Sequence, residues 1–311
     1  MKKARVSDVI DRQTFRRHLV RSDVPGFVFF GCHLASLGVT GWLVSLSLNT
    51  WWLPLAWFLH GTVLVHLFAP LHEATHYTAF RTKWLNDTVA WFCGLVIILS
   101  PTFFRYEHKA HHVHTQHDEN DPEIIRLPKT LRGYLWYLST IPYWTLLVHG
   151  MVDHARGKFS ETDKGFLDEA RRREVMHRAR LMWLFYLLVA LVSFVTGSWA
   201  ALTHWLIPRL IGEPWMRVIR MAEHVGLPLV PNFLENTRTT KVMWPLRVLN
   251  WNMAFHTAHH FAPGVPFHRL PQFHAAIEPH IAHIGENYVE VHGDLVRKIV
   301  EDRQPATTGA D

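Results

Sequence analysis

The chain has 311 residues, of which 49% are hydrophobic, and a formal net charge of +6. Histidine occurs 24 times and tryptophan 14 times. The hydrophobic residues are gathered into long runs, which excludes a disordered chain, a coiled coil and a repeat solenoid. The only cysteines are Cys32 and Cys93, so a disulfide framework and a thiolate metal site are also excluded. Any bound metal would need imidazole or carboxylate ligands.

Two adjacent hydrophobic runs follow a basic N-terminal segment, residues 1–25. Residues 26–48 and 51–70 are each long enough to span a membrane as a helix, and Asn49-Thr50 separates them. They predict a helical hairpin. Lysine and arginine lie before and after this hairpin and not in its turn, so the N-terminus and the segment after residue 70 are expected to face the cytoplasm.

Three later hydrophobic stretches are less regular. Residues 88–104 are expected to be half-inserted or interfacial, residues 133–151 to lie in the interface, and residues 181–211 to form a hairpin broken at 196–198. The charged segment 153–180 is expected to be cytoplasmic, and the chain from residue 213 on to form a cap. The prediction is an all-α integral membrane protein with about four transmembrane helices, interfacial helices and a cytoplasmic helical cap. Its main domain would cover residues 26–285, followed by a C-terminal helix and tail, residues 286–311.

Three short motifs concentrate the histidines. They are His72-Glu73-Ala74-Thr75-His76, His108-Lys109-Ala110-His111-His112 and His256-Thr257-Ala258-His259-His260. In each, the spacing puts the imidazoles on one face of a helix. Eight imidazoles are too many for one tetrahedral zinc and suit two ions of higher coordination number with room for dioxygen. These three motifs, called boxes one, two and three in chain order, can share such a centre only if they meet on one side of the membrane.

Boxes of these forms, in this order after a helical hairpin, resemble the bacterial branch of the membrane fatty acid desaturase/hydroxylase superfamily. Asp121-Pro122-Glu123 and the string from Trp251 to His260 extend the resemblance. It implies a non-haem centre of two iron ions that uses O2 to desaturate or hydroxylate an acyl chain or similar amphiphile. It also implies a further histidine ligand, for which His224 is the candidate. The enzyme would lie in the bacterial inner membrane with its active site cytoplasmic.

Other residues near the boxes are candidates for supporting roles. Asn252 lies four residues before His256, and we expect it to hold a metal-bound water from the same helical face. Nearby carboxylates would accept hydrogen bonds from the second ring nitrogens of the ligands. The candidates are Glu73, Asp118, Asp121, Glu123 and Glu223, with Arg238 expected to pair with one of them. His60 and His66 are expected to serve helix contacts, and no catalytic residue beyond the ligands is expected.

The source of electrons is expected to be a separate protein. The sequence has no cysteine-rich iron–sulfur motif, no Gly-x-Gly-x-x-Gly loop and no His-Pro-Gly-Gly motif. A ferredoxin or similar carrier with its reductase would serve as the donor, and a membrane lipid or acyl-type molecule as the substrate. Nucleic acid is not expected as a partner.

Three alternatives stay open at this point. His72-Glu73-x-x-His76 also matches the signature of zinc proteases, which predicts a membrane zinc metalloprotease but leaves two boxes unexplained. A metal transporter would instead carry its ligands at mid-membrane on broken spans. A hydroxylase or oxygenase of a small non-lipid metabolite is the third, because desaturation and hydroxylation differ only in how the C–H bond is placed.

Overall fold

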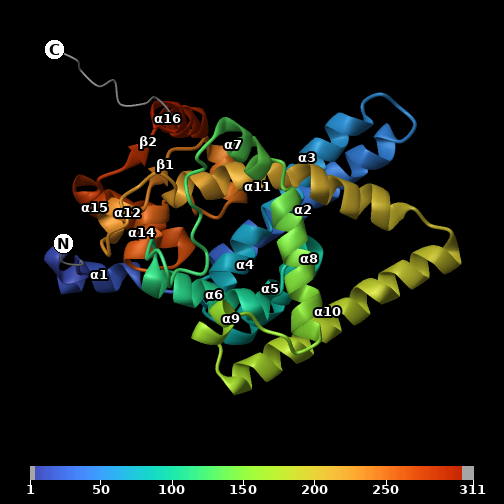
Figure 1. Ribbon diagram of the computed structural model, residues 1–311, viewed down its shortest axis with the longest axis horizontal. Helices are drawn as coiled ribbons and strands as arrows, with labels where there is room; N and C mark the ends of the chain where they lie inside the picture. The colour runs from blue at the N-terminus through green and yellow to red at the C-terminus, as the bar shows by residue number, and fades with distance from the viewer. Residues whose placement is uncertain (1–3, 303–311) are drawn as a thin grey trace, which may run out of the picture.

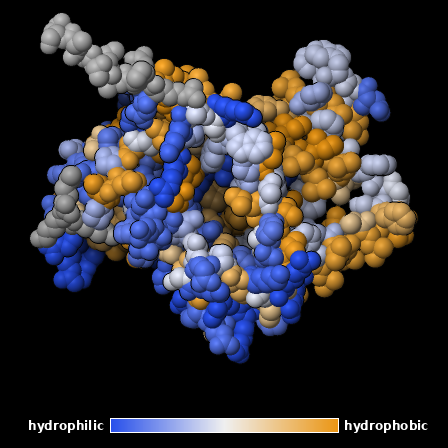
Figure 2. Space-filling model, in the orientation of Figure 1, coloured by the Kyte–Doolittle hydropathy of each residue, from blue (hydrophilic) through white to orange (hydrophobic). Residues whose placement is uncertain are grey.

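The computed structural model describes residues 4–302, and these form an almost entirely helical protein (Figure 1). Within this range three segments are long and apolar enough to cross a membrane: α2 (Asp23–Ser47), α3 with α4 (Leu53–Val65 and Phe68–Thr75), and α10 (Glu169–Thr196). A fourth is added if the bent pair α5 (Lys83–Ile97) and α6 (Pro101–His114) is one span. Apolar side chains cover the α2–α3 hairpin behind its tip and the outer part of α10 (Figure 2). On α10, Phe194 is 84% exposed.

The predicted N-terminal hairpin is present as α2 and α3. The Ser22 hydroxyl caps α2, and Asp23 accepts two hydrogen bonds of 2.8 Å from Thr82, which ties the start of the hairpin to the segment after box one. Of the two histidines predicted to serve helix contacts, His60 contacts Thr40 of α2 through Nδ1, at 2.8 Å, whereas His66 bonds the Thr62 carbonyl one turn earlier in its own chain. The prediction is therefore confirmed for His60. For His66 it stays a prediction, because its hydrogen bond to Thr62 is local, at the end of α3.

The region 181–211 differs from the expected pair of short spans. The break is where it was predicted, because Gly197 ends α10 with a φ of 64°. However, α10 begins at Glu169, capped by Asp168, and so includes residues 169–180 of the charged segment that was expected to be cytoplasmic. The return limb is a π-helical turn, η2 (Leu202–Leu206), that continues into α11 (Ile207–His224). The expected start of the cap at residue 213 therefore falls inside a helix.

Residues 88–104, expected to form one half-inserted or interfacial helix, belong to two helices, α5 and α6. The axes of α5 and α6 differ by 102°. Ile98 takes a left-handed conformation with a φ of 62°, and Pro101 begins α6. The carbonyls freed at the end of α5 accept hydrogen bonds from three later side chains: Tyr186 to Leu95, Trp205 to Val96 and Arg209 to Ile97. This bend keeps box two beside box one. Half-insertion into the membrane stays a prediction.

The remaining elements are short and surround the ends of these helices. In chain order they are η1 (Val6–Asp8), α1 (Arg12–His18), α7 (Leu131–Leu138), α8 (Ile141–Ala155), α9 (Glu161–Phe166), α12 (Phe233–Asn236), α13 (Trp244–Leu249), α14 (His256–Phe261), η3 (Phe267–Arg269), α15 (Leu270–Ile277), η4 (Glu278–His280) and α16 (Tyr288–Glu301). The two-residue strands β1 (Thr239–Thr240) and β2 (Ile284–Gly285) pair in parallel. The predicted C-terminal helix corresponds to α16, and the tail predicted for residues 304–311 lies outside the described residues.

Helices α3 and α11 approach each other closely at two glycines. A Cβ on Gly212 would overlap the backbone of Gly61, and a Cβ on Gly61 would overlap the carbonyl of Pro208. Small residues at such crossings let two backbones pack directly in membrane proteins. Because α11 ends at His224 and α3 leads into box one, this contact sets the spacing of two parts of the histidine site.

The Gly212→Ala variant is expected to be destabilised, because neither backbone can move aside without separating the helices. Overpacking of this kind costs about 1–3 kcal/mol in the free energy of unfolding. The thermal midpoint of the detergent-solubilised protein would measure the loss. Gly150→Ala on α8 is the matched control, since a Cβ there meets no atom within 4 Å. Equal midpoints for the two variants would contradict this prediction.

Candidate metal centre

All three histidine boxes lie on or directly after helices, as predicted. Box one occupies the end of α4 and its C-cap, box two lies on α6, and box three forms most of α14. His224 is the last residue of α11. The turn before α14 uses left-handed conformations at Trp251 and Asn252, with φ values of 50° and 61°. Four helices from distant parts of the chain therefore present their imidazoles to one region.

The first histidine cluster contains five imidazoles whose ligand atoms all lie within 4.8 Å of one another: His72, His76, His108, His112 and His259. The Nε2 atom of His108 lies 2.7 Å from Nε2 of His72 and 3.0 Å from Nε2 of His112. Nε2 of His112 is also 3.0 Å from Nε2 of His259. Two nitrogens bound at right angles to one ion, each about 2.1 Å from it, would be roughly 3.0 Å apart.

The second histidine cluster adjoins the first. His111, His224 and His260 bring their ligand atoms within 4.8 Å, and Nε2 of His256 lies 3.1 Å from Nε2 of His224. The rings of His112 and His260 stack with their centroids 4.2 Å apart, which joins the two clusters. All nine histidines predicted as ligands thus fall into adjoining groups of five and four.

The chemistry of these imidazoles fits metal binding. Ring nitrogens of His76, His111 and His260 are buried and have no hydrogen-bond partner in the described chain, an arrangement that is unfavourable unless another group binds them. Burial, together with neighbouring imidazoles, lowers the pKa of His256, His259 and His260 well below the ordinary value. These side chains are therefore neutral, the protonation state in which histidine binds a metal ion.

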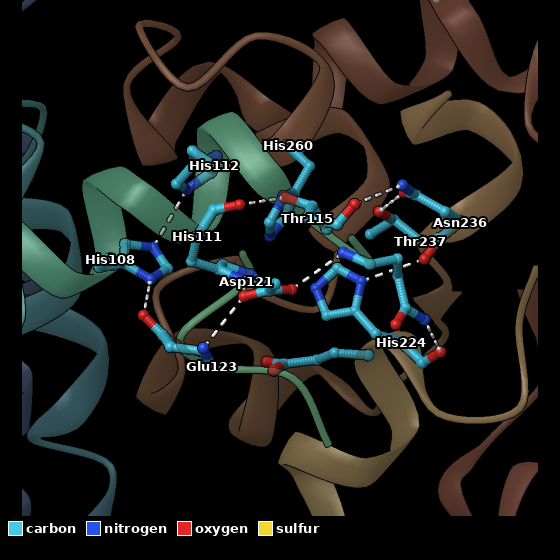
Figure 3. A network of polar contacts seen from close by, with 12 residues as sticks. His108, His111, His112, Thr115, Asp121, Glu123, His224, Asn236, Thr237 and His260 are labelled. Carbon is cyan, nitrogen blue, oxygen red and sulfur yellow. Dashed lines mark hydrogen bonds and ion pairs between the residues drawn. The ribbon is translucent and has the colours of Figure 1, made fainter. Parts of the chain in front are cut away.

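Two of the predicted carboxylates orient ligands directly (Figure 3). Nδ1 of His111 lies 2.7 Å from Asp121, and Nδ1 of His108 lies 2.7 Å from Glu123. Each carboxylate accepts a hydrogen bond from the Nδ1–H group, which leaves the Nε2 lone pair free for a metal. Burial opposes ionisation of Asp121, but hydrogen bonds from His111 and from the backbone amides of Gln116 and Glu123 outweigh it, so the pKa of Asp121 lies below its ordinary value.

Glu73 and Glu223 also lie beside ligand candidates. A Glu73 oxygen is 3.5 Å from Nδ1 of His72 and 3.9 Å from Nδ1 of His259. A Glu223 oxygen is 3.8 Å from Nδ1 of His256. These separations are longer than hydrogen bonds, so neither carboxyl group holds an imidazole directly.

Three expectations about supporting residues are wrong. Asp118 lies on the surface and pairs with Arg126, because the loop after box two turns it outward. Arg238 donates to the carbonyls of Ala222 and Val225 at the end of α11 instead of pairing with a carboxylate of the boxes. Asn252 does not share a helical face with His256, because it lies in the turn before α14. Its amide is held by Arg247 and by the Phe267 carbonyl.

Arg220 is a supporting residue that the sequence reasoning missed. It lies on α11, one turn before His224, and its guanidinium is 2.6 Å from Glu123 and 2.7 Å from Glu223. It therefore joins the carboxylate behind His108 to the one beside His256. The signal was present in Arg220-x-x-Glu223-His224, since side chains at i and i+3 meet on a helix. The pairing of Arg220 with Glu123, in the loop after α6, depended on the fold.

A cavity of about 360 Å³ lies next to the first cluster. Phe68 and Phe104 form part of its wall, and their rings pack against His72 and His108, with Phe104 stacked on His108 at 4.9 Å. The other apolar lining residues come mainly from α3, α5, α8 and the loop after box two, whereas α11 contributes Arg209, Glu213, Arg217 and Arg220. Figure 2 shows the molecule hollowed near the centre of this face, with apolar atoms at depth. The volume of the cavity lies in the range of ligand-binding cavities.

The Asp121→Asn variant is expected to weaken metal binding by roughly 10–100-fold, because an amide lacks the negative charge and cannot accept from both His111 Nδ1 and the backbone N–H of Gln116. Titration of the metal-free protein with ferrous ion, under anaerobic conditions, would measure the affinity. Asp118→Asn is the matched control, since Asp118 is exposed and touches no histidine of the boxes. Unchanged affinity in Asp121→Asn would contradict the role assigned to this carboxylate.

The fold and the site define a helical integral membrane protein with an oriented, buried polyhistidine centre. The family model described as fatty acid desaturase matches residues 49–292, so the chain belongs to the fatty acid desaturase family and is an oxidoreductase of lipid metabolism. The resemblance predicted from the boxes is thereby confirmed.

Several cyanobacterial desaturases are similar over most of their length. The "sn-1 oleoyl-lipid 12-desaturase" of Picosynechococcus sp. is 24% identical over 79% of this chain and 75% of its own. The protein of the same name from Anabaena variabilis is 24% identical over 84% of this chain and 79% of its own. The "sn-1 acyl-lipid omega-3 desaturase (ferredoxin)" of Nostoc sp. is 21% identical over 76% and 70%.

Proposed function

We propose that this protein desaturates an acyl chain of a lipid or similar amphiphile at a centre of two iron ions. The observation that carries the proposal is the convergence of nine imidazoles into adjoining clusters of five and four, on buried and oriented rings. His72, His76, His108, His112 and His259 would hold one ion, and His111, His224, His256 and His260 the other. The bound irons would supply the activation of O2 that oxidation of an unactivated C–H bond needs.

The chain's own residues would prepare this reaction in three ways. Asp121 and Glu123 hold the Nδ1 protons of His111 and His108, so both rings keep one orientation. The apolar walls of the cavity exclude water from the hydrocarbon beside Phe68 and Phe104. The cavity would also fix which C–H bonds lie near the centre, and that placement selects between desaturation and hydroxylation.

Desaturation removes two hydrogens from the substrate and reduces O2 to two waters, which requires two electrons and two protons. We propose that a ferredoxin or similar carrier with its reductase delivers the electrons, as the name of the Nostoc relative indicates for that protein. The centre would face the cytoplasm of a bacterial inner membrane, because basic residues flank the hairpin on that side. Acyl lipids, on which the named relatives act, are the proposed substrates.

The convergence also weakens the protease alternative. His72 and His76 share their cluster with imidazoles of boxes two and three, so the His-Glu-x-x-His pair does not stand alone. Metal analysis of the purified protein separates the two functions, since about two irons per chain support the desaturase and one zinc the protease. Comparing the lipids and small metabolites of cells with and without the protein, with a reductase supplied, would test the reaction. New double bonds in acyl lipids are expected, and an unchanged acyl profile would contradict the proposal.

A further inference from the structure

The cavity beside the first histidine cluster carries hydrogen-bond donors that no residue of the described chain uses. Nε of Arg217, on α11, and the hydroxyl of Tyr137, on α7, are both buried and have no hydrogen-bond partner among residues 4–302. Both side chains line the cavity. Burial raises the pKa of Tyr137, so its hydroxyl keeps its proton and remains a donor. Buried donors without acceptors are unfavourable, which points to an acceptor supplied by a ligand.

The other contacts of Arg217 hold its guanidinium in place and leave positive charge in excess. One oxygen of Glu213 lies 2.6 Å from Arg217, and the other pairs with Arg209. A single carboxylate is therefore shared by two guanidinium groups. The guanidinium carbon of Arg217 also lies 4.0 Å from the ring centre of Tyr143, a stacked arrangement that fixes its plane. Nε is the part of this group left to bind something else.

The cation nearer the histidines is already paired. Arg220 lies 2.6 Å from Glu123, which lines the cavity behind His108, and 2.7 Å from Glu223. An anion would therefore find its free donor at Arg217. On α11, Arg217 lies seven residues before His224, about 10 Å along the axis. Phe68 and Phe104 form the wall of the cavity beside His72 and His108, so an apolar part of the cavity lies next to the histidines.

We propose that Arg217 and Tyr137 bind the anionic head group, a carboxylate or a phosphate, of an amphiphile whose hydrocarbon chain extends toward the histidine clusters. This inference rests on the proposed function, because it takes the cavity as the substrate site. The head would accept hydrogen bonds from Arg217 Nε and from the Tyr137 hydroxyl. With the head group held at Arg217 and Tyr137, a carbon further along the hydrocarbon chain, and not one of its first carbons, would lie at the metal centre.

The test is a binding competition that does not depend on turnover. Radiolabelled oleate would be bound to the purified protein in detergent and displaced by methyl oleate or by 1-oleoyl-lysophosphatidate. We expect at least one of the two anions, oleate or the lysophosphatidate, to bind about tenfold or more tightly than the neutral ester, the effect of one hydrogen bond to a charged group. The anion that binds more tightly identifies a carboxylate or a phosphate head. Equal affinities for all three would overturn the proposal.

Two variants assign the effect to the site. Arg217→Gln and Tyr137→Phe should each reduce the preference for the anion about tenfold, and Tyr137→Phe keeps the ring and removes only the hydroxyl. Arg132→Gln is the matched control, since Arg132 is an exposed arginine on α7. If Arg217→Gln and Arg132→Gln behave alike, the head-group site is overturned while a lipid desaturase with normal iron content would still stand. Wild-type protein without iron and without new double bonds would instead overturn the proposed function.

Discussion

Replacing His112 or His260 by alanine is expected to abolish turnover and to lower the iron content of the purified protein. Nε2 of His112 lies 3.0 Å from both His108 and His259, and the His260 ring stacks on His112 and packs edge to face with His224. No other side chain can take either place without moving a helix. The loss should exceed the roughly 10–100-fold that removal of a supporting contact costs.

Iron per chain by elemental analysis, and acyl products by gas chromatography, would measure these two effects. His268→Ala is the control, because His268 belongs to neither cluster and is expected to leave iron content unchanged. Full iron content and full activity in both His112→Ala and His260→Ala would refute their role as ligands.

The Arg220→Met variant is expected to be strongly destabilised. Arg220 is 8% exposed and pairs with Glu123 and Glu223, whose side chains are almost as buried. Methionine keeps the length of the side chain but leaves both carboxylates without their cation. Breaking a buried pair in this way costs about 3–5 kcal/mol in the free energy of unfolding.

The thermal midpoint would report this loss, and adding Glu223→Gln to Arg220→Met should recover part of it by removing one unpaired charge. Arg126→Met is the matched control. Its partner Asp118 is exposed, and exposed pairs contribute only about 0–1 kcal/mol. Similar midpoints for Arg220→Met and Arg126→Met would show that the buried pairs do not stabilise the fold as inferred.

Much of the membrane region could be predicted because local hydrophobicity decides it. The hairpin at residues 26–70 and the break near Gly197 follow from run length and from a residue that tolerates positive φ. The start of α10 at Glu169 was missed, because charged residues can form the first turns of a helix that later enters a membrane. The continuity of η2 with α11 was also missed. The carbonyls of Thr203 and His204 in this π-helical turn bond to Trp57 and His60, which are distant in sequence.

The residue types and spacing within each box, and therefore the ability of short helices to present imidazoles on one face, were determined by the sequence alone. His224, a single histidine at a helix end, was found only through resemblance. The tertiary structure decided which imidazoles share a cluster, which carboxylates lie behind them, and that Arg220 joins Glu123 to Glu223. The physical reason is range: helical spacing acts over three or four residues. A polyhistidine centre depends on helix crossings, such as that of Gly61 with Gly212, between segments more than a hundred residues apart.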